Sequence, residues 1–92
     1  NAPAALDKYV DIAKALEVYT PGMTKEEAAD AACTEIENLS RRVGIPAHLS
    51  DLGITEADID ALADQAIADV CTPGNPREVT RDDIVALYKS IL

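Results

Sequence analysis

The sequence of 92 residues is poor in aromatic side chains, with no phenylalanine and no tryptophan. Three tyrosines supply the only rings, which are 3% of the chain. The 48% of the residues that are hydrophobic are therefore mostly alanine, leucine, isoleucine and valine. A core of such small aliphatic side chains lets helices approach one another closely, so the composition favours packed helices.

Basic residues are also scarce, since 8 of them stand against 17 acids and give a formal net charge of -9. Such a surface repels the phosphates of nucleic acids and anionic lipid headgroups, so neither is expected as a partner. No apolar run approaches the roughly 18 residues that a membrane-spanning helix needs. No signal-peptide pattern opens the chain either.

Two cysteines, Cys33 and Cys71, are too few for a disulfide framework, so a reducing cytoplasm is the expected location. The length allows one domain at most, and we expect a single helical (sub)domain over residues 1–92. Because the chain starts at Asn1 without an initiator methionine, we interpret it as an excised fragment.

Apolar residues recur at steps of three and four along most of the chain, which is typical of helices with one buried stripe. In the second segment this predicts an inner stripe of Ala28, Ala32, Ile36, Leu39 and Val43. No alternating strand pattern is present, so the fold class is all-α, a bundle of about five helices. The helices are expected within residues 2–18, 23–44, 45–53, 54–70 and 80–92.

Three of these segments begin with a threonine that is followed, three residues later, by an acid. This spacing is typical of a capping box, in which each side chain bonds the backbone amide of the other residue. The three pairs are Thr24 with Glu27, Thr55 with Asp58, and Thr80 with Asp83.

Candidate metal ligands are sparse. His48 is the only histidine, whereas zinc and iron sites usually recruit several His or Cys ligands, so a surface or cap position is expected for it. Asp58 and Asp60 lack the glycine and terminal glutamate of a calcium-binding loop, so we expect a solvated acidic face there. The sequence predicts no metal ligand and no cofactor-binding residue in this piece.

Ser50 invites comparison with acyl carrier proteins, which are also small, acidic and helical. Those proteins attach their prosthetic arm at an Asp-Ser-Leu triplet, whereas Leu49 precedes Ser50 and Asp51 follows it here. The reversed order argues against a carrier protein.

The two cysteines lie in different settings. Cys33 falls among alanines in the middle of a predicted helix, where a cysteine packs as a small apolar residue. Cys71 follows the carbonyl end of a helix, where the dipole disfavours a thiolate, and no histidine is near it in sequence. We therefore expect no catalytic residue, and Cys71 is either a buried plug or a small wall of a cavity.

The stretch "DVCTPGNPREVTRDDIVALYKSIL" resembles the C-terminal end of iron-dependent (group III) alcohol dehydrogenases, above all the lactaldehyde reductase and propanediol oxidoreductase branch. The stretches "KYVDIAKALEV", "GMTKEEAADAA" and "LSRRVGIPAHLSDLGITEADIDALADQAIADVC" agree in the same order. The likeness therefore covers nearly the whole chain. It implies the C-terminal part of the helical metal-binding domain of the dehydroquinate-synthase-like fold.

This resemblance also implies what the chain lacks. Family members bind NAD(P) in an N-terminal domain and hold a divalent metal, usually Fe²⁺ and otherwise Zn²⁺, through an Asp and three His that lie upstream of this piece. In the parent enzyme the metal polarises a small alcohol or aldehyde while hydride passes to or from the cofactor. The expected partners are thus the nucleotide-binding domain, the upstream metal-ligand helices and further copies in a homo-oligomer. The isolated piece is expected to be inactive.

Within the family, Cys71 matches a position that lines the substrate cleft, and Arg77 is expected to tie the same loop to carbonyls of the missing part. A truncated piece should also expose apolar faces, and the alanine-rich stripes of the first two helices are the candidates. The alternative is a free-standing acidic helical module that recruits a basic protein partner.

Overall fold

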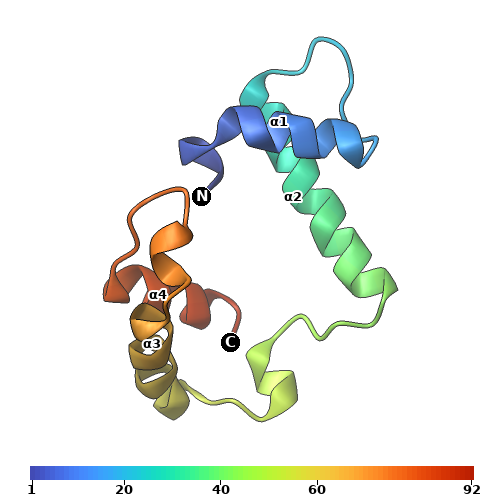
Figure 1. Cartoon of the computed structure of the whole chain (residues 1–92). Coiled ribbons are helices and arrows are strands. Elements are labelled where there is room, and N and C mark those ends of the chain that lie inside the picture. Colours follow the sequence, from blue (N-terminus) through green and yellow to red (C-terminus); the bar gives the residue numbers. More distant parts are fainter. The chain divides into compact units, whose positions relative to one another are not determined.

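The computed structural model describes all 92 residues and contains helices but no strand, which confirms the all-α prediction (Figure 1). The predicted helix within residues 45–53 is only a 3-10 helix, Leu49–Leu52, which ends at Gly53 in the left-handed region with φ 81°. The four α-helices are α1 (Leu6–Ala15), α2 (Lys25–Arg42), α3 (Ile59–Ala68) and α4 (Arg81–Ser90).

The chain forms two compact units, Asn1–Ile45 and Pro46–Leu92. A single (sub)domain over residues 1–92 stays a prediction. None of the helices is long and apolar enough to cross a membrane.

In the first unit, α1 packs against the first half of α2 through alanines. Ala13, Ala28 and Ala32 are fully buried, and larger side chains such as Tyr9 and Met23 surround them. The alanines therefore bring the two helices together and are not an exposed surface, so the expectation of exposed stripes is wrong for the alanine-rich parts of both helices.

The start of α2 has the predicted capping box. The backbone N–H of Glu27 donates to Thr24 Oγ1 at 3.1 Å, and the N–H of Thr24 donates to Glu27 Oε1 at 3.5 Å. Lys25 pairs with Asp7 of α1 at 2.6 Å, which joins the two helices at the surface.

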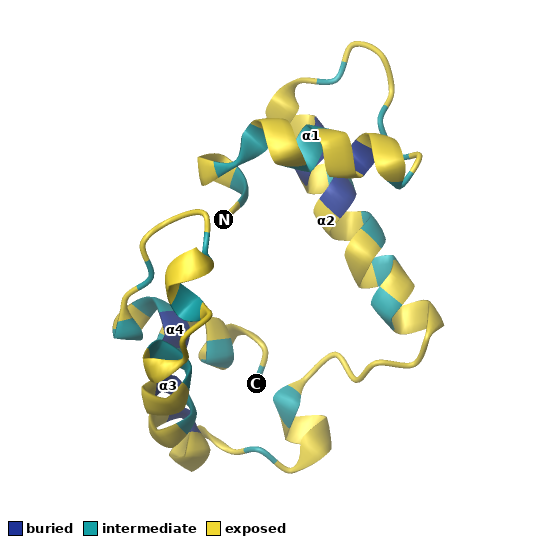
Figure 2. Ribbon diagram, viewed as in Figure 1, coloured by how far each residue is buried: buried dark blue, intermediate teal, exposed yellow.

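The second half of α2 differs from the prediction. Ile36, Leu39 and Val43 continue the inner stripe in the sequence, but they are exposed in the structure (Figure 2). The shorter helix α1, with 10 residues against 18 in α2, crosses the first half of α2 and so leaves its second half uncovered (Figure 1).

In the second unit, α3 packs against α4, and the buried residues of these helices are Ile59, Ala63 and Ile84. Arg81 at the start of α4 reaches two acids of α3, with Nε 2.6 Å from Asp64 Oδ1 and Nη2 3.1 Å from Asp60 Oδ1. These contacts fix the start of α4 against α3.

The segment before α3 is held by the end of the chain. The backbone N–H of Leu49 donates to the Ile91 carbonyl at 2.8 Å, and that of Ser50 donates to the Leu92 carbonyl at 3.2 Å. The 3-10 helix Leu49–Leu52 is therefore part of the same unit as α4.

Candidate functional site

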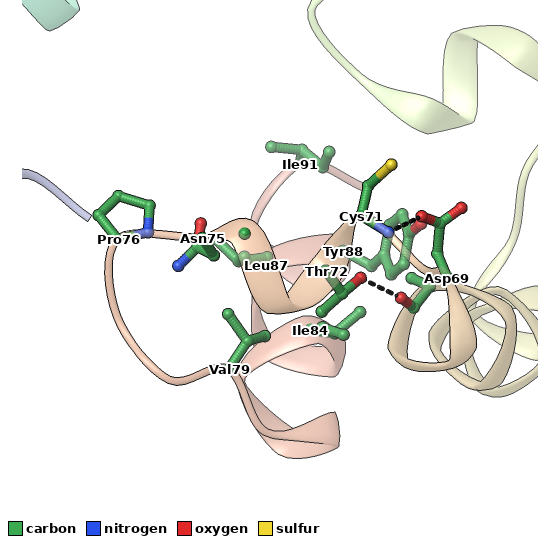
Figure 3. Close-up of a pocket in the computed structure, with 12 residues that line it drawn as sticks. Asp69, Cys71, Thr72, Asn75, Pro76, Val79, Ile84, Leu87, Tyr88 and Ile91 are labelled. Carbon is green, nitrogen blue, oxygen red and sulfur yellow. Dashed lines mark hydrogen bonds between the residues drawn. The ribbon is translucent and has the colours of Figure 1, made fainter.

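The loop between α3 and α4 is fastened to the end of α3 by two side chains. Asp69 Oδ1 accepts from the backbone N–H of Cys71 at 2.7 Å, and Thr72 Oγ1 donates to the Ala66 carbonyl at 2.6 Å (Figure 3). A 3-10 turn, Thr72–Gly74, follows directly. The prolines of the loop are thus not its only source of rigidity.

The other end of the loop is fastened to α4. The Asn75 side-chain amide donates to the Arg77 carbonyl at 2.9 Å, and Arg77 Nη2 pairs with Asp83 Oδ2 at 3.1 Å. The backbone N–H of Thr80 donates to the same Asp83 oxygen at 2.9 Å. This amide, then the Thr80 hydroxyl and the Arg77 guanidinium, lower the pKa of the Asp83 carboxyl below its usual value.

A pocket of about 590 Å³ lies between this loop and α4. The loop contributes Cys71, Thr72, Gly74, Asn75 and Pro76. The rest of the lining is mainly apolar and comes largely from α4 and its C-terminal end, with Ile84, Leu87, Tyr88 and Ile91. The pocket can therefore hold an aliphatic chain against α4, with hydrogen-bonding groups at the loop.

Cys71 lies at the edge of this pocket and is exposed. In Figure 3 its sulfur points away from Val79 and Ile84. The exposure excludes a buried plug within this chain, and the role of Cys71 as a wall of the substrate cleft stays a prediction. Cys33 is exposed as well, so the expectation that it packs as an apolar residue is wrong: the buried face of α2 passes through the neighbouring Ala32 instead.

The other singled-out polar residues have structural partners or face solvent. His48 is exposed and precedes the 3-10 helix Leu49–Leu52 without a capping hydrogen bond from its side chain. Asp58 Oδ2 accepts from the N–H of Thr55 at 2.8 Å, and this bond is the main cause of the lowered pKa of Asp58. The structure brings none of these residues to the pocket.

No group of three or more His, Cys, Asp or Glu side chains lies close enough together to hold a metal ion. The residues of this chain thus do not fit a metal centre by themselves. Any metal chemistry at this pocket would need ligands from other polypeptide segments.

Sequence reasoning did not identify Asp69 and Thr72 as the residues that hold the Cys71 loop. A signal was present, because Asp and Thr directly after a helix often bond nearby backbone groups in turns. Leu87 and Tyr88 of α4 also line the pocket, and Leu87 is 64% exposed.

The family model for the C-terminal part of Fe-containing alcohol dehydrogenases matches residues 1–92. The chain therefore belongs to the Fe-containing alcohol dehydrogenase family and corresponds to its C-terminal region.

Individual relatives agree with this assignment. Lactaldehyde reductase from Escherichia coli (strain K12) is 52% identical over 88 residues, which are 96% of this chain and 23% of that protein. NAD-dependent methanol dehydrogenase from Bacillus methanolicus is 35% identical over 92 residues, which are all of this chain and 24% of that protein. The chain thus spans about a quarter of the length of these relatives.

A solved structure, a crystal structure of 1,3-propanediol oxidoreductase, is similar with a TM-score of 0.94 and 33% sequence identity. The match covers 99% of this chain and 24% of the solved chain. The same helical fold therefore occurs within a chain about four times as long.

Proposed function

We propose that this chain is the C-terminal helical portion of a metal-dependent, NAD(P)-linked alcohol dehydrogenase that interconverts alcohols and aldehydes or ketones. The match of the family model to all 92 residues is the observation that carries this proposal. Residues 1–92 would form one helical (sub)domain within a larger C-terminal domain.

In this proposal the chain supplies scaffold and one wall of the substrate cleft. Cys71 is the wall residue, because it is exposed at a pocket and its loop is fastened at both ends. A thiol is small and weakly polar, so it leaves room for the substrate beside it. The apolar side chains of α4 would contact the carbon chain of a small alcohol or aldehyde.

The metal and the dinucleotide belong to other segments of the parent protein. Because this chain has no cluster of metal ligands, Fe²⁺ or Zn²⁺ would be held by helices upstream, and NAD(P) by an N-terminal domain. The metal would act there as a Lewis acid. The parent enzyme is proposed to be a cytoplasmic homo-oligomer, and the acidic surface argues against nucleic acid as a partner.

Substitution of Cys71 by phenylalanine in the parent enzyme tests the wall. A large ring at this position narrows the cleft, so we expect kcat/KM for bulky aldehydes to fall at least about ten-fold more than for the smallest ones. Cys33→Phe is the matched control, since Cys33 is also exposed but belongs to α2 and is not among the residues that line the pocket. Equal losses for small and bulky substrates in Cys71→Phe would show that Cys71 is not a cleft wall.

A free-standing acidic interaction module is the second candidate, supported by the net charge of -9. It does not account for the similarity over the whole chain to a family of dehydrogenases. The natural reading frame distinguishes the two, because only the enzyme needs an upstream nucleotide-binding domain.

A further inference from the structure

The second half of α2 presents an apolar surface that no part of its own unit covers. The side chains that form it, which we call the α2 face, are Ile36, Leu39, Val43 and Ile45, with exposed fractions of 46%, 45%, 64% and 57%. The first three are spaced by three and four residues and therefore lie on one side of the helix.

The end of α2 adds the fourth residue to this surface. The N–H of Ile45 donates to the Ser40 carbonyl at 2.9 Å, the N–H of Gly44 donates to the Arg41 carbonyl at 3.1 Å, and Gly44 has φ 79°. These are the two hydrogen bonds of a Schellman motif, which turns the chain back toward the last helical turn. The motif thereby places Ile45 beside the end of the apolar stripe.

The opposite side of α2 is polar, so the helix is amphipathic along its whole length. Thr34, Glu37 and Arg41 lie there, all three are exposed, and Arg41 Nη2 is 4.0 Å from Glu37 Oε2. An apolar stripe that continues for two more turns beyond α1 is typical of a helix that packs against a second partner.

The lengths of the relatives indicate what this partner is. The chain fills 23% of lactaldehyde reductase and 24% of the solved 1,3-propanediol oxidoreductase chain, whose matched part has the same fold with a TM-score of 0.94. The remaining three quarters would be tethered to this piece, and a tethered segment reaches effective concentrations on the order of millimolar. A second copy is disfavoured in comparison, because each copy carries a net charge of -9.

We propose that the α2 face is the docking surface for an apolar segment of the same, longer polypeptide, upstream of these 92 residues. This inference rests on the proposed function, which assumes such a polypeptide. Its occupant would be apolar and uncharged where it contacts Leu39, because the flanking charges, Glu35 and Arg42, already pair with each other at 2.6 Å.

The test compares the longer protein from the natural reading frame with the 92-residue chain. In each, Leu39→Gln replaces an apolar side chain of the α2 face by a neutral one of similar size, and Thr34→Gln introduces the same side chain on the opposite, polar side. We expect Leu39→Gln to lower the melting temperature of the longer protein by about 4 °C or more, as loss of a buried leucine does. Thr34→Gln should shift the melting temperature of either protein by less than about 1 °C. The same small shift is expected for Leu39→Gln in the short chain.

Amide hydrogen exchange of the unsubstituted proteins serves as a second measurement if Leu39→Gln prevents folding. We expect residues 36–45 to exchange at least about ten-fold more slowly in the longer protein. Equal effects of the two substitutions in the longer protein would overturn the proposal. An equal loss of melting temperature from Leu39→Gln in both proteins would overturn it as well. Slower amide exchange of residues 36–45 in the short chain at higher protein concentration would also overturn it, because a second copy would then cover the α2 face. None of these readouts uses enzyme activity, so an inactive longer protein that shows the Leu39 effect would refute only the proposed function.

Discussion

Substitution of Thr72 by valine should loosen the loop that carries Cys71. Thr72 Oγ1 donates to the Ala66 carbonyl at 2.6 Å in a partly buried position, and this bond joins the loop to the last turn of α3. Valine has nearly the same shape, so the substitution removes the hydroxyl donor without opening a cavity. The substitution should therefore lower the stability of the closed loop by the contribution of one hydrogen bond.

The structure sets the size of this loss. A typical intramolecular hydrogen bond contributes about 1 kcal/mol net, and an acceptor left without any partner costs more. The Ala66 carbonyl keeps a second donor, the N–H of Asp69 at 3.3 Å, so the larger penalty does not apply. A loss of about 1 kcal/mol raises the population of the open loop roughly five-fold.

Hydrogen exchange measured by NMR tests this value at the loop itself. The N–H groups of Gly74 and Asn75 donate within the turn to the carbonyls of Cys71 and Thr72, so their exchange reports its opening. Both should exchange about five-fold faster in Thr72→Val, whereas Thr72→Ser, which keeps the hydroxyl, should restore most of the protection. If serine were as fast as valine, or valine as slow as the natural protein, the bond to Ala66 would not hold the loop.

Three further perturbations address the two units and their caps. Ile59→Ala removes a side chain that is 2% exposed and should lower the free energy of unfolding, measured in urea, by about 3 kcal/mol. Val70→Ala is the control, because Val70 is 91% exposed and its loss should change this free energy by less than about 0.5 kcal/mol. Similar losses at the two sites would contradict the assigned core. Ala32→Leu places a larger side chain where α1 packs against α2 and should lower the free energy of unfolding by about 2 kcal/mol. An unchanged midpoint of urea unfolding would mean that the alanines are not closely packed. Acid should destabilise the second unit through Asp83, because the Thr80 amide lowers the pKa of the Asp83 carboxyl. The stability that Asp83 contributes is complete above the ordinary pKa of Asp, about 3.9, and is lost as the pH falls through the lowered pKa. Asp83→Asn should remove this part of the dependence of stability on acid pH. If stability fell with pH in the same way in the variant, Asp83 would not be the responsible group.

The helix starts could be predicted from the sequence because their causes are local. Thr24 and Glu27 are three residues apart, and a capping box needs nothing from the rest of the fold. The same holds at Thr80, where Asp83 accepts the reciprocal bond. Family resemblance carried the functional assignment, since no reactive group in the chain indicates the chemistry.

Burial could not be predicted in the same way, because it depends on which helix lies alongside. Ile36 and Leu39 belong to the same stripe as Ala32, yet they are exposed because α1 contacts only the first half of α2. The fastening of the Cys71 loop was missed for a related reason. Thr72 and its acceptor at Ala66 are brought together only after the chain has turned at the end of α3.

We propose that this chain supplies scaffold and one wall of the substrate cleft to a dehydrogenase and holds none of its reactive groups. The most direct test measures Fe²⁺ binding under anaerobic conditions, together with NAD(P)-linked aldehyde reduction, for the 92-residue chain and the longer protein in parallel. We expect metal binding and turnover in the longer protein and neither in the short chain. Tight iron binding with alcohol oxidation by the 92 residues alone would contradict it.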